Sequence, residues 1–234
     1  MLPIRDDQPR YSIPLVTWFL IALNLLIFVF EASLDQRSLN ALIHQFGVIP
    51  SHLGALLAGS HRFPLAVVAL PFFTSMFLHG SWMHVIGNMW FLYIFGDNVE
   101  DYLGHFKYLV FYILTGLIAM TAQVVINLHS TLPTVGASGA IAGVLGAYFI
   151  LYPRARVLTW VFEVIFLVLW LPAWTVLGVW FVFNFLSGTN TALAVHRQSM
   201  GNVAFWAHVG GFISGALLVK VFGERQLRHP YAAA

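Results

Sequence analysis

Apolar residues in this chain form long runs, separated by shorter segments that hold most of the charged residues, glycines and prolines. A helix needs about 20 apolar residues, within a range of roughly 17 to 25, to cross the hydrocarbon core of a membrane. Five runs approach this length and predict membrane-spanning helices at Pro14–Glu31, Phe77–Phe95, Tyr108–Leu128, Ala137–Tyr152 and Val203–Phe222.

The stretch Val157–Leu186 allows two interpretations. It forms either two short spans, or an interfacial segment up to Leu171 followed by one span from Pro172, where the proline restarts the helix. The basic residues favour the second, because cytoplasmic loops collect Lys and Arg. Six spans place eight basic residues on one side and three on the other, whereas seven spans give five against six. We therefore predict six spans with both termini cytoplasmic, and Val157–Leu171 in or near the interface. The eight are Arg5, Arg10, Lys107, Arg154, Arg156, Lys220, Arg225 and Arg228.

The composition agrees with a membrane protein, since 59% of the residues are hydrophobic and only 9% are charged. Soluble domains carry about 25% charged residues. We expect an all-α fold with one membrane domain at residues 14–222 and cytoplasmic tails at residues 1–13 and 223–234. The scattered basic residues argue against nucleic-acid binding. The absence of cysteine excludes disulfides and thiolate metal sites. No small-residue cleavage site follows the first run, so we expect it to be retained as a span.

A serine lies at the start of the fourth predicted span, in the sequence GASG at residues 136–139. The first turn of a helix offers free backbone N–H groups and the positive end of the helix dipole, which suits an oxyanion. Ser138 is thus a candidate nucleophile. The alternative is packing, because Gly139 and Gly143 form a GxxxG pair of the kind found at helix contacts.

A histidine lies about one turn inside the sixth predicted span, in AFWAHVGGFISG. An ionisable residue within a span is a functional candidate, because leaving it unpaired in hydrocarbon is costly. Gly211 and Gly215 follow His208 on the same helical face, so we expect His208 to point into a close helix contact. The alternative is a histidine that merely hydrogen-bonds a neighbouring hydroxyl.

The second predicted span opens with HGSWMHVIGNMWF, which contains His79, His84 and Asn88. His84 and Asn88 are four residues apart and share a helical face. Both side chains can donate to an oxyanion, and both also serve as ordinary hydrogen-bonding groups between membrane helices. In the six-span topology these residues, Ser138 and His208 all lie near the outer ends of their helices. A nucleophile, a base and oxyanion donors can therefore meet in one half-buried pocket.

The ordered motifs HxxxN, GASGAIAGVLGAY and AHVGGFISG resemble the rhomboid family of intramembrane serine proteases over about Leu70 to Phe222. The resemblance implies Ser138 as nucleophile and His208 as general base, with Asn88, His84 and the backbone of Ser138 in the oxyanion hole. It also implies transmembrane protein substrates within the lipid bilayer, no metal and no cofactor. Access for the substrate would be gated by Trp174–Leu186 and by the polar loop Ser187–Asn202. We expect a bacterial cytoplasmic membrane as the location.

Two features depart from the family pattern. Many members carry an aromatic residue four positions after the serine, which packs on the histidine, and here Ala142 holds that position. We expect other side chains, such as Tyr148 or Trp206, to orient His208. The Trp-Arg pair of the first outer loop is also missing, and His61-Arg62 is the nearest basic element.

Other functions are compatible with parts of the sequence. A transport or proton-relay protein could use His79, His84 and His208 along a polar path, but no acidic relay residue or inverted repeat accompanies them. A rhomboid-like binder that does not cut is disfavoured by the retained serine and histidine. Haem ligation by two histidines would leave Asn88 and Ser138 without a purpose. A zinc protease would need HExxH, which is absent.

Overall fold

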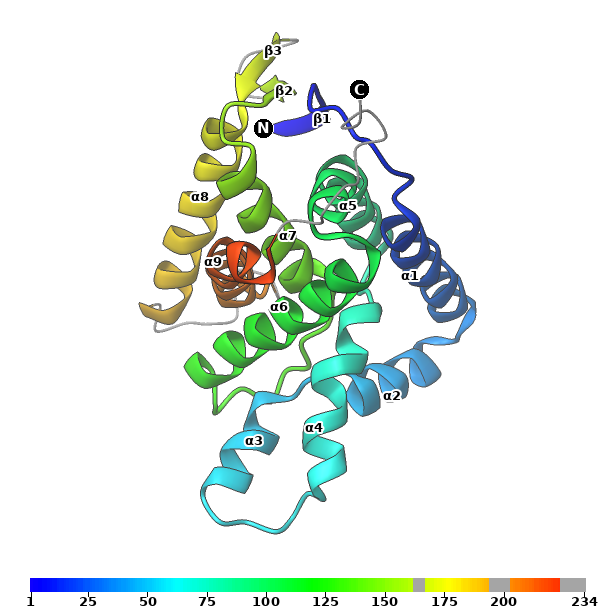
Figure 1. The fold of residues 1–234 in the computed structure, drawn as a ribbon. Coiled ribbons are helices and arrows are strands. Elements are labelled where there is room, and N and C mark those ends of the chain that lie inside the picture. The colour runs from blue at the N-terminus through cyan, green and yellow to red at the C-terminus, as the bar shows by residue number, and fades with distance from the viewer. Residues whose placement is uncertain (162–166, 194–202, 224–234) are drawn as a thin grey trace, which may run out of the picture.

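The computed structural model describes residues 1–161, 167–193 and 203–223 and is mainly a bundle of helices (Figure 1). A helix is present at each of the six predicted spans. The second begins later than predicted and runs further, because Ser81 accepts a hydrogen bond from the His84 N–H and caps the helix there. The six helices are α1 (Leu15–Ser33), α5 (Trp82–Leu103), α6 (His105–Ile126), α7 (Ser138–Leu151), α8 (Ala173–Leu193) and α9 (Phe205–Phe222).

Not all six helices are long and apolar enough to be recognised as spans by those properties alone. Within the described residues, three helices qualify, namely α1, α6 and α9. A fourth span is added if α5 is joined to the segment Leu65–Phe77, from which it is bent by 75°. The six-span count and the orientation of the termini therefore stay predictions. The fold class is confirmed as a helical, membrane-spanning bundle.

The long connection between α1 and α5 folds into short helices. These are α2 (Gln36–Phe46), α3 (Pro50–Leu57), α4 (Leu65–Thr74) and the 3-10 helix η1 (Ser75–Phe77), and they lie together at one side of the bundle in Figure 1. Backbone hydrogen bonds join this connection to the loop before α7, between Val48 and Thr134 and from Gly136 N–H to the Ser75 carbonyl. The connection thus holds the loop that leads to the candidate nucleophile.

A small antiparallel sheet was not predicted. It consists of β1 (Leu2–Asp6), β2 (Arg156–Val161) and β3 (Leu167–Pro172), in the order β1-β2-β3. The described parts of the segment Val157–Leu171 therefore lie in the antiparallel strands β2 and β3, and the N-terminal tail supplies an edge strand. The position of Val157–Leu171 in or near the interface stays a prediction. β1 contacts α5 while β2 and β3 contact α8, so the sheet bridges these two helices (Figure 1).

Acidic side chains at the end of α5 fix the start of α1. Glu100 is fully buried and accepts hydrogen bonds from the backbone N–H groups of Val16 and Thr17, at 2.9 and 2.7 Å. These N–H groups belong to the first turn of α1, where backbone N–H groups have no acceptor within their own helix. His105 Nδ1 lies 2.6 Å from the same carboxylate. A buried carboxylate is stabilised when it is paired and hydrogen-bonded in this way.

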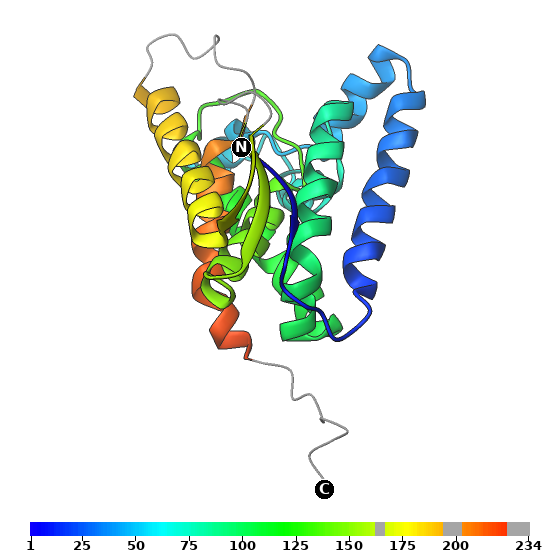
Figure 2. The same ribbon diagram turned by 90° about the horizontal axis from the view of Figure 1, so that it is seen from above.

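Helix α7 occupies the centre of the bundle and is almost entirely buried. It packs on α5, α6 and α9, and its closest contact is with α9 (Figure 2). Glycines make this approach possible. A Cβ on Gly211 would collide with the carbonyl oxygen of Gly139, and a Cβ on Gly215 with that of Gly143. Gly143 follows Gly139 by four residues on α7, and its partner Gly215 follows Gly211 by four residues on α9. The two helices therefore run parallel.

Candidate active site

Ser138 is the first residue of α7 and follows a tight loop. Gly136 has φ of 132°, a backbone conformation that side chains with a Cβ rarely adopt. The Gly136 N–H donates to the Ser75 carbonyl at 2.8 Å, which anchors the loop. As the first residue of the helix, Ser138 has a backbone N–H without a partner inside α7. The hydroxyl of the candidate nucleophile and a backbone N–H free to donate therefore belong to one residue.

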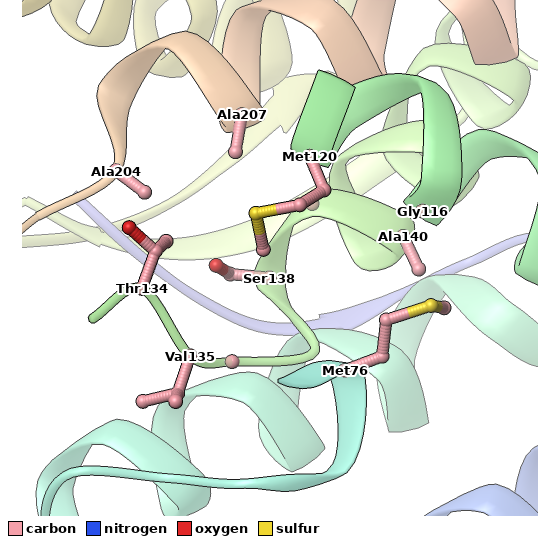
Figure 3. A pocket seen from close by; sticks show the side chains of 11 residues that line it. Met76, Gly116, Met120, Thr134, Val135, Ser138, Ala140, Ala204 and Ala207 are labelled. Carbon is pink, nitrogen blue, oxygen red and sulfur yellow. The ribbon is translucent and has the colours of Figure 1, made fainter. Parts of the chain in front are cut away.

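The Ser138 side chain is half-buried and points into a small cavity (Figure 3). The cavity has a volume of about 10 Å³, which is room for about one water molecule. Its lining combines α6, the loop before α7 and the first turn of α9, through Met120, Thr134, Ala204 and Ala207. A small polar molecule can therefore sit beside the serine at the end of the bundle where α7 and α9 begin.

The contact between α7 and α9 brings His208 to the same end of the bundle as Ser138. Ser138 immediately precedes Gly139, and His208 lies three residues before Gly211, the glycine that packs on Gly139. Both belong to the first turn of their helices. Ser138 and His208 are both in the described part of the chain, and no hydrogen bond joins them there. Hydrogen bonds of catalytic pairs are often long until substrate binds.

His208 is held by two residues of α8 that the sequence analysis missed. Its Nδ1 lies 2.6 Å from Asn184 Oδ1, and its ring lies 5.6 Å from the Trp180 ring at an angle of 36°. The expectation that Tyr148 or Trp206 would orient the histidine was wrong. The Tyr148 hydroxyl hydrogen-bonds Asp6, and Trp206 packs on Phe185 instead. An asparagine within the apolar run of α8 was the available signal, since such residues commonly bond across helices.

His84 lies close to the serine. A Cβ built on Gly136 would be 2.8 Å from His84 Nε2 and 3.6 Å from Ser138 Oγ, so the two side chains border the same small space. The His79 ring packs edge-on against the His84 ring, with centroids 5.1 Å apart. His79 is itself buried, and its backbone N–H donates to Glu31 of α1 at 3.1 Å. Glu31 was also missed in the sequence.

Asn88 lies one turn below His84 on α5 and is 9% exposed. Its Nδ2 is buried and has no hydrogen-bond partner among the described residues. Most buried polar groups are paired, and each exception needs an explanation. An amide donor that is kept dry and unpaired is available to a group that arrives with the substrate.

These features define a helical integral membrane protein with a serine and a histidine at one end of two parallel, tightly packed helices. A protein-family model described as the rhomboid domain matches residues 68–225, more than half of the chain and all of the candidate site residues. The chain belongs to the rhomboid family.

Three curated relatives have names that refer to rhomboid proteins and to a eukaryotic organelle. Rhomboid protein 1, mitochondrial, of Saccharomyces cerevisiae is 31% identical over 147 residues, covering 61% of this chain and 39% of the relative. Presenilin-associated rhomboid-like protein, mitochondrial, of Mus musculus is 26% identical over 185 residues, covering 75% and 44%. Rhomboid-like protein 11, chloroplastic, of Arabidopsis thaliana is 39% identical over 83 residues, covering 36% and 28%. The chain therefore spans less than half the length of these relatives.

Proposed function

We propose that this protein is an intramembrane serine endopeptidase in which Ser138 is the nucleophile and His208 the general base. The observation that carries the proposal is the glycine contact between α7 and α9, which brings the first turns of the two helices together. The Asn88 Nδ2, which has no hydrogen-bond partner among the described residues, and the position of His84 beside Gly136 add support. Family membership supports the class of reaction.

The proposed reaction proceeds through an acyl-enzyme. Ser138 Oγ attacks the carbonyl carbon of the scissile peptide while its proton passes to His208 Nε2. The charge that develops on the carbonyl oxygen is stabilised by the Ser138 backbone N–H, Asn88 Nδ2 and His84. His208 then protonates the leaving amine, the C–N bond breaks, and an ester remains on Ser138. A water molecule attacks this ester and gives its proton to His208. His208 returns a proton to Ser138 Oγ as the ester C–O bond breaks, and the new carboxyl terminus is released.

The rate enhancements typical of such groups indicate that the base and the oxyanion donors are all required. A positioned base contributes about 10²–10⁴-fold, and one oxyanion donor about 10²–10³-fold. Neither alone accounts for useful hydrolysis of a peptide bond. The substrate class in the proposal is a transmembrane protein segment that reaches the site past α8. The predicted polar loop Ser187–Asn202 is helical up to Leu193, the end of α8, and residues 194–202 lie outside the described residues. The role of this loop in gating substrate access stays a prediction, as does a bacterial cytoplasmic membrane.

The proposal is tested by reconstituting the protein in liposomes with a reporter protein that has one transmembrane segment. We expect cleavage by the wild type and none by Ser138→Ala or His208→Ala. A fluorophosphonate probe should label the wild type and not Ser138→Ala. Equal processing by all three proteins, or labelling that survives Ser138→Ala, would overturn the assignment.

A further inference from the structure

Asn184 of α8 connects the substrate-side helix to the proposed base. Its side chain is 4% exposed and uses both ends of its amide. Nδ2 donates to the Trp180 carbonyl at 2.8 Å, and Oδ1 lies 2.6 Å from His208 Nδ1. The residue is therefore fully paired, with one partner in its own helix and one in α9.

These two contacts determine where the proton of His208 resides. A backbone carbonyl can only accept, so the Trp180 carbonyl selects the NH₂ end of the Asn184 amide. The opposite end is then the oxygen, which also can only accept. His208 Nδ1 must consequently carry a hydrogen, and in the neutral ring Nε2 is left with its lone pair.

We propose that Asn184 is the positioning residue of the Ser138–His208 dyad, holding His208 in the tautomer and orientation in which Nε2 accepts the serine proton. The inference rests on the proposed function. Asn184 occupies the place that a buried aspartate has in a serine triad, on the far side of the imidazole from the nucleophile. Together with Trp180 it also substitutes for the aromatic side chain that Ala142 cannot provide, because both residues hold the ring from α8.

The location of Asn184 makes the base dependent on α8. Ser138 and His208 lie on helices that are locked together through glycines, whereas both groups that orient the imidazole come from a neighbouring helix. If α8 moves away to admit a substrate, the hydrogen bond to His208 breaks. The base is correctly oriented only after α8 has returned to its place against α9.

The first test compares Asn184→Leu with a matched control. Asn24 of α1 is also buried and also donates through Nδ2 to the carbonyl four residues earlier, Leu20, at 2.7 Å. Asn24→Leu thus removes the same intrahelical bond without touching His208. We expect fluorophosphonate labelling of Ser138 to slow by roughly 10²-fold in Asn184→Leu, as for loss of a positioned base, and to change little in Asn24→Leu. Equal rates in the two variants would overturn the proposal.

The second test uses Asn184→Asp and a pH profile. A carboxylate at this position still accepts from Nδ1, and it stabilises the charged imidazolium. The titratable group facing His208 from α5 is His84, and no carboxylate among the described residues hydrogen-bonds to His208. We therefore expect Asn184→Asp to keep activity at high pH and to move the acid limb of the labelling profile upward by at least one pH unit. A purely structural role would leave the limb unmoved, and that result would contradict the proposal.

A spectroscopic test separates this proposal from the proposed function. In ¹⁵N-histidine-labelled protein, with the His208 signals identified by comparison with His208→Ala, we expect protonated Nδ1 and unprotonated Nε2. Asn184→Leu should give a mixture of the two tautomers. If the wild type fails to react with the probe, the protease assignment falls, and the spectra alone decide on the hydrogen bond. Spectra that stay unchanged in Asn184→Leu would overturn the proposal that Asn184 positions His208.

Discussion

Gly215 of α9 lies directly against Gly143 of α7, so closely that a Cβ on Gly215 would collide with the Gly143 carbonyl oxygen. Packed interiors accommodate little added volume, and overpacking costs typically about 1–3 kcal/mol. We expect Gly215→Ala to separate the two helices, lower the thermal unfolding midpoint in detergent and slow probe labelling of Ser138. Gly87→Ala is the control, because no atom of the described residues lies within 4 Å of the Cβ position of Gly87 on α5. Equal behaviour of the two variants would show that the contact between α7 and α9 does not hold the dyad together.

Gly136 provides a second test of the geometry around the serine. An alanine there would have to adopt φ near 132° and would place its Cβ 2.8 Å from His84 Nε2. A positive φ costs a non-glycine residue about 1–2 kcal/mol. We expect Gly136→Ala to displace His84 and to reduce cleavage of the reporter substrate at least tenfold. Gly80→Ala, where the added Cβ meets open space, should keep cleavage near the wild-type rate.

Asn88 should show opposite effects on stability and activity. Its Nδ2 is buried and has no partner in the described part of the chain, so replacing Asn88 by Leu removes an unsatisfied donor, a change that is neutral or stabilising in folded proteins. The same change deletes a proposed oxyanion donor, which should lower kcat by about 10²–10³-fold. Thermal unfolding and reporter cleavage, measured on the same preparation, check both effects. A marked loss of thermal stability would mean that Asn88 has a structural partner in the protein.

Asp6 should make stability depend on pH. This residue of β1 lies outside the helical spans, and burial raises the pKa of its carboxyl from 3.8 to about 6, although a hydrogen bond from Tyr148 opposes the shift. A raised pKa in the folded state means that folding favours the protonated acid. The contribution of Asp6 to the free energy of unfolding should therefore be largest below about pH 4 and should decrease as the pH rises to about 6.

Unfolding of the wild type and of Asp6→Asn between pH 4 and pH 7.5 isolates this contribution. We expect the amide variant, which does not titrate, to lose less stability over the interval. Parallel curves for the two proteins would show that Asp6 titrates alike in the folded and unfolded states.

The sequence predicted the helices better than the contacts that organise them. The longest apolar helices, α1, α6 and α9, are recognisable by length and composition, and the glycines after His208 correctly indicated a close helix contact. The position of Asn184 opposite His208 depends on how α8 rotates against α9, and one chain's pattern does not determine that angle. Ala142 holds a position at which many rhomboid proteins have an aromatic residue that packs on the histidine. The prediction that Tyr148 or Trp206 takes over this contact was wrong, because it too depends on how the helices are rotated against one another.

The sheet was missed because short apolar segments do not distinguish a strand from a helix. Residues 157–171 lack both the length of a span and a clear alternation of polar and apolar side chains. The strand that pairs with β2 consists of residues 2–6, which are far from it in the sequence. No local pattern therefore reveals the pairing. The hydrogen bond from Trp90 Nε1 to the Pro3 carbonyl at 2.7 Å is likewise a long-range contact.

The register of this sheet also constrains the order of assembly. Leu2 pairs with Trp160 and Asp6 with Val157, so the first strand has no partner until residues near position 160 have left the ribosome. By then α1, α5, α6 and α7 have all been synthesised and can already have inserted. The N-terminal strand therefore has no strand partner until these helices have been synthesised, and its pairing with β2 follows their synthesis.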